Sequence, residues 1–301
     1  WYKGVTFDQS KTKFIQIDID PMEIGRNYPV EIGAIADLKL ALKQILAAAK
    51  EIKPEGIDRP ELRAEIAAYK AEFRKANKAI SEDGRFPMTP QRILKDVKEI
   101  LPEDALIFTD VGWNKNGVAQ QYDITVPGTI NHPSGLATMG FGSAAVLGAK
   151  LAAPDKKAVC LIGDGGFGTN PSVIATAVEQ NIPVVWVVMN NSAFGTIAGL
   201  QNMHYNTTYG TVFEANGTSY SPDWAAVARG YGIKAKKITS ADEFAVVLKE
   251  ALDSNEPYLI DCPMENIPVP TPGAWNINDI YTKRDEVVEG RLAFEGEKKD
   301  K

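Results

Sequence analysis

The stretch that most constrains this chain is GDGGFGTNPSVIATAVEQNIPVVWVVMNN, which runs from Gly163 to Asn191. It follows the apolar run AVCLIG and contains a helix-like segment and a second apolar run, VVWVVM. Two apolar strands joined by one helix are typical of a parallel sheet, because parallel neighbours need a crossover connection. An acid follows the first predicted strand, and two asparagines follow the second. The pattern therefore predicts polar groups at the carboxyl ends of neighbouring strands, where ligands bind in such sheets.

The same alternation of strands and helices continues through the second half of the chain. Apolar runs at 105–110 and 258–262 predict further strands, and helices are expected at 90–100, 140–153 and 241–253. We therefore expect an α/β fold with a parallel sheet of about six strands and helices on both of its faces.

The first third of the chain has a different pattern. The alternating segment FIQIDI at 14–19 predicts a strand, and an apolar stripe over 37–50 predicts a helix. A polar, proline-containing stretch follows and is typical of a linker. We expect a partial α/β unit at 1–50, a linker at 51–87, and the sheet-containing domain with a C-terminal tail at 88–301.

Composition narrows the classes of function. The 301 residues carry a formal net charge of -6 and no basic patch, so nucleic-acid binding is not expected. No apolar run reaches the roughly 18 residues of a membrane-spanning helix, and no signal peptide is visible at the start. The two cysteines, Cys160 and Cys262, lie in apolar runs and are expected to be buried thiols. Together these features favour a cytoplasmic protein.

The polar groups at the predicted strand ends suit a particular ligand. A carboxylate from Asp164 and amide oxygens from the Asn190–Asn191 pair are hard oxygen ligands, which suit Mg²⁺. The glycines around Asp164 allow backbone N–H groups to approach a diphosphate closely. A lone Gly-Asp-Gly is most often a simple turn after a strand. The Asn pair after 24 intervening residues makes the combination far more specific.

These residues resemble the thiamine diphosphate-dependent enzymes of the acetolactate synthase type. The cofactor motif of that family is Gly-Asp-Gly, some two dozen residues, then Asn-Asn, which this chain matches at 163–165 and 190–191. SGLATMGFGSAAVLGAKLA (134–152), FTDVG (108–112) and FIQIDIDPMEIG (14–25) are also similar to family segments. The resemblance implies a carboxyl-terminal diphosphate-binding domain, preceded by part of the family's central domain.

The resemblance also implies roles for individual residues. Asp164, the Asn191 side chain and the backbone carbonyl of Ala193 would hold Mg²⁺. Met139 would be an apolar wedge that bends the cofactor, and the carbonyl of Ala137 would accept from the cofactor's amino group. The implied cofactor-binding residues are Asn114, Ala137, Met139, Gly163, Asp164, Gly165, Gly166 and Asn191.

Catalytic side chains are not assigned by the motifs. His132 and His204 flank the cofactor segments, and each could be an acid/base group near neutral pH or an ordinary loop histidine. Thr196, Phe194 and Gln201 are further candidates.

The segment that contains them, SAFGTIAGLQNMHYNTTYG, lines the substrate region in the family. Leu200 stands where the family's acetolactate synthases carry a tryptophan, and the glutamate of its pyruvate decarboxylases is missing near Ile197.

The resemblance implies a thiamine diphosphate- and Mg²⁺-dependent enzyme that forms or cleaves C–C bonds in 2-oxo acids such as pyruvate. A 2-oxo acid decarboxylase, a 2-hydroxyacyl lyase and a non-catalytic cofactor-binding subunit are alternatives. A dinucleotide-binding protein is less favoured, because GDGGFG is a poor match to G-x-G-x-x-G.

In the family, an activating glutamate comes from a pyrimidine-binding domain of the same or another chain. We find no such domain here, so we expect an inactive isolated chain and a homo-oligomeric complete enzyme. FAD or a nucleotide in the central domain stays an open possibility.

Overall fold

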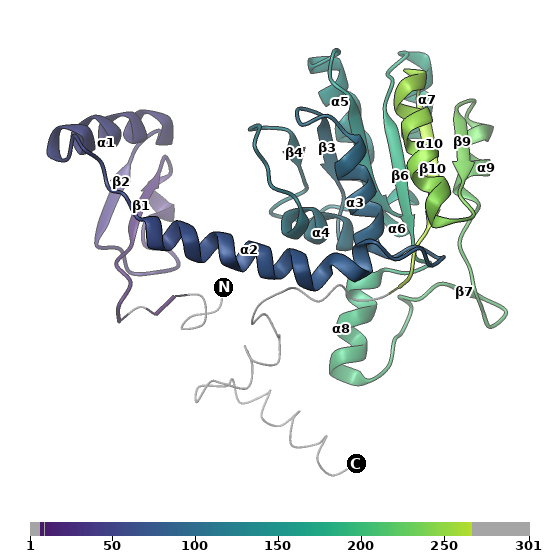
Figure 1. The fold of residues 1–301 in the computed structure, drawn as a ribbon, viewed down its shortest axis with the longest axis horizontal. Coiled ribbons are helices and arrows are strands. Elements are labelled where there is room, and N and C mark those ends of the chain that lie inside the picture. Colours follow the sequence, from purple (N-terminus) through teal and green to yellow (C-terminus); the bar gives the residue numbers. More distant parts are fainter. Residues whose placement is uncertain (1–6, 9, 267–301) are drawn as a thin grey trace, which may run out of the picture. The chain divides into compact units, whose positions relative to one another are not determined.

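The structure is a computed structural model that describes residues 7–8 and 10–266, with only the backbone of Met203 and His204. The expected C-terminal tail beyond residue 266 lies outside the described residues. The chain divides into two compact units between Tyr69 and Lys70, and each is treated by itself (Figure 1).

The first unit is a small α/β element. Strand β1 (Ile15–Asp18) pairs in parallel with β2 (Ile32–Ile35), and a 3-10 turn, η1 (Pro21–Glu23), lies between them in sequence. Helix α1 (Leu38–Ile52) begins behind Asp37, whose carboxylate accepts the Leu40 N–H at 2.9 Å. The strand and helix expected here are therefore confirmed. Helix α2 (Pro60–Ser81) follows and crosses the division between the two units.

The second unit is built on a six-stranded parallel sheet. Its strand order is β4-β3-β5-β6-β10-β9, and every adjacent pair is parallel. The strands are β3 (Leu106–Thr109), β4 (Ile130–Asn131), β5 (Ala158–Gly163), β6 (Val185–Asn190), β9 (Lys234–Lys237) and β10 (Tyr258–Pro263). Strands β5 and β6 are neighbours, as the opening motif predicts, so their carboxyl ends lie at one edge. A two-stranded hairpin, β7 (Glu214–Ala215) and β8 (Thr218–Ser219), lies outside this sheet.

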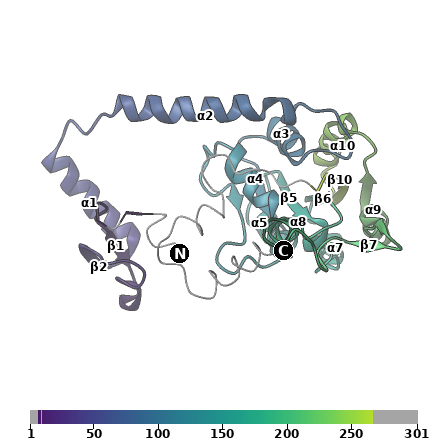
Figure 2. The same ribbon diagram turned by 90° about the horizontal axis from the view of Figure 1, so that it is seen from below.

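Helices cover both faces of the sheet (Figure 2). One core joins α3 (Pro90–Ile100), α4 (Trp113–Gln121) and α10 (Ala241–Ser254) to one set of strand side chains. The other core joins α5 (Phe141–Ala152), α6 (Asp164–Phe167), α7 (Val173–Glu179) and α9 (Trp224–Gly230) to the alternate set. Strand β5 shows the alternation, with Val159 and Leu161 in the first core and Cys160 and Ile162 in the second. The predicted α/β fold is confirmed.

Helix starts follow from capping residues in the sequence. Thr89 accepts the Arg92 N–H at 3.1 Å and starts α3, while Ser240 accepts the Glu243 N–H at 3.3 Å and starts α10. After Asn170-Pro171 the helix begins later than the sequence suggests, at Val173, because tighter turns occupy 170–172. Helix α8 (Gly195–Tyr205), which follows the Asn pair, was not predicted.

Two further features concern the described part of the chain. Cys160 and Cys262 are both buried and unpaired, and burial raises the pKa of each thiol. Among the helices that the structure describes, none has the length and apolar character needed to cross a bilayer.

Candidate functional site

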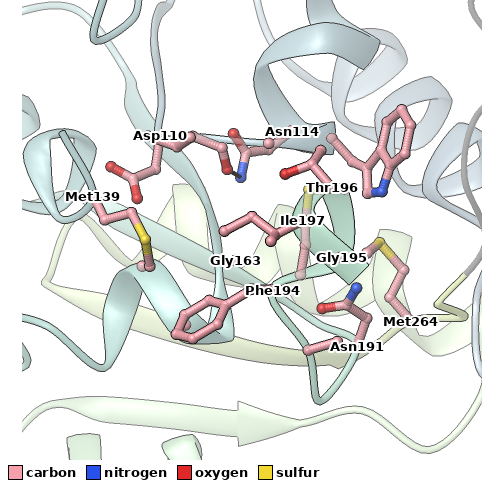
Figure 3. A pocket seen from close by; sticks show the side chains of 17 residues that line it. Asp110, Asn114, Met139, Gly163, Asn191, Phe194, Gly195, Thr196, Ile197 and Met264 are labelled. Atoms are coloured by element: carbon pink, nitrogen blue, oxygen red, sulfur yellow. Dashed lines mark hydrogen bonds between the residues drawn. The ribbon is translucent and has the colours of Figure 1, made fainter. Parts of the chain in front are cut away.

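A cavity lies at the carboxyl ends of β3, β5 and β6, where the sequence predicts a ligand (Figure 3). Its wall is formed by residues 110–114 after β3, Met139, the glycines at 163, 165 and 166, and residues 191–197 after β6. Figure 3 shows Asp110 and Met139 together on one side of the cavity, and Asn191 with Met264 on the other. The parallel topology therefore gathers the three motif segments, which are far apart in sequence, around one cavity.

Three oxygen-bearing groups converge beside this cavity. One outer atom of the Asn191 amide, placed as the oxygen, lies 3.0 Å from the Ala193 carbonyl oxygen and 3.1 Å from Asp164 Oδ1. Neighbouring ligands in an octahedron with bonds of 2.0–2.1 Å lie about 2.9 Å apart, which is the geometry Mg²⁺ demands. If the amide turns by 180°, its NH₂ group donates to both oxygens instead. The cluster can hold a small divalent cation, and it can close on itself by hydrogen bonds when none is bound.

Asp164 supplies the charge of this cluster from behind the cavity wall. Its side chain is buried, with 2% of the residue exposed, and Oδ2 has no hydrogen-bond partner among the described residues. Burial raises the pKa of Asp164 to about 6, and backbone N–H groups that include those of Gly165, Ser192 and Ala193 limit the shift. A buried carboxylate of this kind is best satisfied by a cation.

The two asparagines of the pair have different roles. Asn190 is buried, donates to Asp261 Oδ1 at 2.9 Å and accepts the Ser192 N–H at 3.4 Å. Ser192 has a φ of 53°, so this bond stabilises an unusual backbone turn. Asp261 is fully buried, and burial raises its pKa, opposed by the bond from Asn190 and the charge of Lys237. Asn190 therefore fixes the turn, and Asn191 presents its amide to the cavity.

Two glycines of the motif leave room for other side chains. A Cβ on Gly165 would lie 2.5 Å from Cε1 of the Phe194 ring and 3.5 Å from Cε of Met139. A Cβ on Gly166 would overlap the carboxylate of Asp110. Both positions therefore require glycine for packing, in addition to any close approach of a ligand.

The Met139 segment is a short, strained turn before α5. Ala137 has a φ of 48° and donates its N–H to Ser134 O at 3.0 Å, and Gly140 has a φ of 85°. Met139 lines the cavity beside Gly165, whereas Ala137 lies in the preceding turn and is not part of the wall.

The wall after β3 contains unpaired polar groups. Asn114 Nδ2 donates to Val111 O at 3.1 Å, whereas Asn114 Oδ1 and Trp113 Nε1 are buried and have no partner among the described residues. Both residues line the cavity, so its wall contains one unpaired acceptor and one unpaired donor. Sequence reasoning missed Trp113 and Asp110, although Asp110 follows a predicted strand and stands in the quoted FTDVG segment.

The catalytic candidates fall in different places. Thr196 and Phe194 line the cavity, and Phe194 packs edge-to-face on Phe213 with ring centroids 4.8 Å apart. Gln201 is not part of the wall. Its amide accepts the Tyr209 N–H at 3.1 Å and the Thr211 hydroxyl at 2.6 Å, which ties α8 to the following loop.

No histidine side chain that the structure describes is part of the cavity wall. His132 is exposed in the loop after β4 and does not line the cavity. The side chain of His204 lies outside the described part of α8. Leu200, on the same helix, is 44% exposed.

Comparison with known proteins matches this geometry to a family. The description "Thiamine pyrophosphate enzyme, C-terminal TPP binding domain" matches residues 110–262, and "Thiamine pyrophosphate enzyme, central domain" matches residues 2–45. The first match covers the strand ends, the glycine loop and the Asn pair.

Similar curated proteins carry acetolactate synthase names. The chain is 37% identical over 287 residues to the "Probable acetolactate synthase large subunit" of Methanocaldococcus jannaschii, covering 92% of this chain and 46% of that protein. It is 31% identical over 312 residues to the chloroplastic acetolactate synthase of Arabidopsis thaliana, covering 97% of this chain and 45% of that protein. The chain thus spans about half the length of these relatives. The expected resemblance is confirmed, and the chain belongs to the thiamine pyrophosphate (thiamine diphosphate) enzymes.

Proposed function

We propose that this chain binds thiamine diphosphate through Mg²⁺ and forms the diphosphate half of an active site that makes or breaks C–C bonds in 2-oxo acids, as in acetolactate synthase. The observation that carries the proposal is that Asp164 Oδ1 and the Ala193 carbonyl oxygen both lie within 3.1 Å of one outer atom of the Asn191 amide. These three groups would hold Mg²⁺ with one carboxylate and two neutral oxygens, which would leave positive charge to attract the diphosphate.

The glycine loop and the wall after β3 complete the diphosphate site in this proposal. Gly163, Gly165 and Gly166 all line the cavity, where their backbone would lie beside the diphosphate. Trp113 Nε1, which has no partner among the described residues, would donate to a phosphate oxygen. Asn114 lies in the same wall, with Nδ2 4.0 Å from the place of a Cβ on Gly163, and this NH₂ group would be a second donor to the diphosphate.

The remaining residues shape the reacting end of the site. When bound, thiamine diphosphate supplies the reactive carbon and the electron sink that C–C cleavage beside a carbonyl requires. Met139 would exclude water and contact the cofactor from one side, and the carbonyl of Ala137, in the turn before Met139, would accept from its amino group. Thr196 supplies a hydroxyl in the wall for substrate, whereas His132 and Gln201 lie outside the wall.

A direct binding experiment tests the cofactor assignment. Titration calorimetry with thiamine diphosphate should show saturable binding in Mg²⁺ and its loss in EDTA. Asp164→Ala should abolish the Mg²⁺-dependent binding, because the cation loses the one carboxylate of its site. Full binding by the Asp164→Ala protein would refute the assignment.

Turnover needs a second component in this proposal. A pyrimidine-binding domain, from the same or another polypeptide, supplies the activating glutamate, and the complete enzyme is a homo-oligomer in the cytoplasm. Assays with pyruvate and a panel of 2-oxo acids should give turnover only when that domain is present. Full turnover by chain 1–301 alone would refute the requirement. Cofactor binding without any turnover by the complete protein would assign it to a non-catalytic role, and cleavage of 2-hydroxyacyl compounds would assign a lyase.

A further inference from the structure

Asp110 is a buried carboxylate at the cavity that the proposed function does not use. It follows β3, is 1% exposed, and accepts the Gly140 N–H at 3.0 Å on Oδ2 and the Gly142 N–H at 3.2 Å on Oδ1. Among the described residues, no lysine or arginine forms an ion pair with it. Its two bonds both go to the segment that carries Met139.

The start of α5 depends on this carboxylate. Gly140, at the N-cap, has no side chain that could accept hydrogen bonds from the free N–H groups at the start of the helix. Asp110, which directly follows β3, accepts two of these hydrogen bonds instead. Gly142 also packs closely on β3, because a Cβ there would lie 2.9 Å from the Thr109 carbonyl oxygen. The carboxylate and this contact together hold the first turn of α5 on the end of β3.

The same contact fixes the backbone next to Met139. Gly140 directly follows Met139, and its φ of 85° is a left-handed conformation that glycine adopts readily, held here by the bond from its N–H to Asp110. On the other side of Met139, the turn at Ala137 is closed by one backbone bond, to Ser134 O at 3.0 Å. Asp110 also packs against Gly166 of the glycine loop, where a Cβ would overlap its carboxylate. One side chain thus links the Met139 segment to the glycine motif.

We propose that Asp110 is a positioning residue that fixes Met139 at the height and angle at which it contacts the organic part of thiamine diphosphate. This inference rests on the proposed function. The carboxylate faces α5 and holds the backbone amides, so it acts through Met139 and does not touch the diphosphate.

The test compares two ligands on the full chain. Asp110→Asn keeps the shape of the side chain, but an NH₂ group cannot accept a hydrogen bond. One of the two backbone N–H groups, of Gly140 or Gly142, therefore loses its acceptor. Affinity for thiamine diphosphate with Mg²⁺ should fall about tenfold. This is the low end of the loss, about 10- to 100-fold, that typically follows when a residue that orients a ligand-binding residue is removed. Affinity for inorganic diphosphate with Mg²⁺ should change much less, since the proposed diphosphate site does not include Met139. Hydrogen exchange at the Gly140 and Gly142 amides should accelerate without any ligand.

Matched variants separate positioning from a general loss of stability. Asp96→Asn removes another buried carboxylate, which pairs with Arg92 far from this cavity, and should leave the ratio of the two affinities unchanged. Gly140→Ala should displace the same segment without altering Asp110, because its Cβ would overlap Thr169 Oγ1. This variant replaces Asp110→Asn in the test if Asp110→Asn does not fold. Met139→Ala combined with either variant should give less than additive losses.

The possible outcomes are distinct. If the unaltered chain binds neither ligand, the proposed function fails and this inference fails with it. If the unaltered chain binds both, and the Asp110 and Gly140 variants lose both affinities equally or keep both, the inference is overturned while the proposed function stands.

Discussion

Replacing Asp164 by asparagine should stabilise the metal-free protein while abolishing its response to the cofactor. Burial raises the pKa of Asp164 from 3.8 to about 6, so the folded protein pays for ionising this carboxylate at neutral pH. A shift of about two units corresponds to about 3 kcal/mol, at about 1.4 kcal/mol per unit. Asparagine removes the charge and keeps the shape. At about 2–4 °C per kcal/mol for a unit of this size, the melting temperature should rise by about 6–12 °C.

The raised pKa of Asp164 also determines how the stability gained by Asp164→Asn depends on pH. A raised pKa in the folded state means that the neutral acid is favoured there, so no penalty exists below about pH 4, where the unfolded chain is also protonated. The penalty develops between about pH 4 and pH 6 and is constant above. The Asp164→Asn protein should therefore gain stability at pH 8 and gain almost none at pH 4.

Thermal unfolding with and without ligands measures both parts of this prediction. At a thiamine diphosphate concentration about 100 times the dissociation constant, in Mg²⁺, the unaltered protein should gain about 2.7 kcal/mol, and the variant close to none. Asp96→Asn is the matched control for the cofactor response, because the Asp96 carboxylate is also buried but pairs with Arg92 at 2.8 Å and does not line the cavity, so this variant should keep the full gain on ligand binding. A lower melting temperature for metal-free Asp164→Asn at pH 8, or an equal rise at pH 4 and pH 8, would refute the reasoning.

Three further substitutions test individual contacts. Asn190→Ala leaves the buried Asp261 carboxylate without its amide donor and should lower the free energy of unfolding by about 1–3 kcal/mol in urea denaturation; no loss would show that this bond is unimportant. Gly165→Ala places a Cβ 2.5 Å from the Phe194 ring and should weaken thiamine diphosphate binding at least tenfold by calorimetry. Unchanged affinity would mean that the loop adjusts. Gln201→Ala frees the loop after α8 and should speed hydrogen exchange at 206–211, with unchanged cofactor affinity; slower or equal exchange would contradict its role as a clamp.

The sequence was sufficient for the sheet and for the place of the site. Strands such as β5 and β6 are continuous apolar runs because both faces are buried, and their ends carry the Gly-Asp-Gly and Asn-Asn residues. Parallel pairing then determines that these ends meet, with no further information needed. The short edge strands β4 and β9 were missed, since β4 has two residues and β9 is the polar run KAKK.

Side-chain roles were harder to predict, because they depend on contacts between distant segments. Nothing local distinguishes Asn190 from Asn191, yet one bonds to Asp261 on the neighbouring strand and the other faces the cavity. Gln201 reads as a polar residue of the substrate region, but its amide is bonded to the loop eight to ten residues further on. Asp110 has a visible signal, an acid at a strand end, whose partners in α5 appear only in the fold. The expected domain limits at residues 50 and 88 stay a prediction.

The most direct test of the central claim is a crystal structure of the chain with thiamine diphosphate and Mn²⁺, which substitutes for Mg²⁺ and scatters anomalously. We expect one anomalous peak within about 2.2 Å of Asp164 Oδ1, Asn191 Oδ1 and the Ala193 carbonyl oxygen, with diphosphate oxygens completing an octahedron. We also expect the Asn191 amide to turn its oxygen toward the ion. A cofactor bound elsewhere, or an ion held without Asp164 and Asn191, would contradict it.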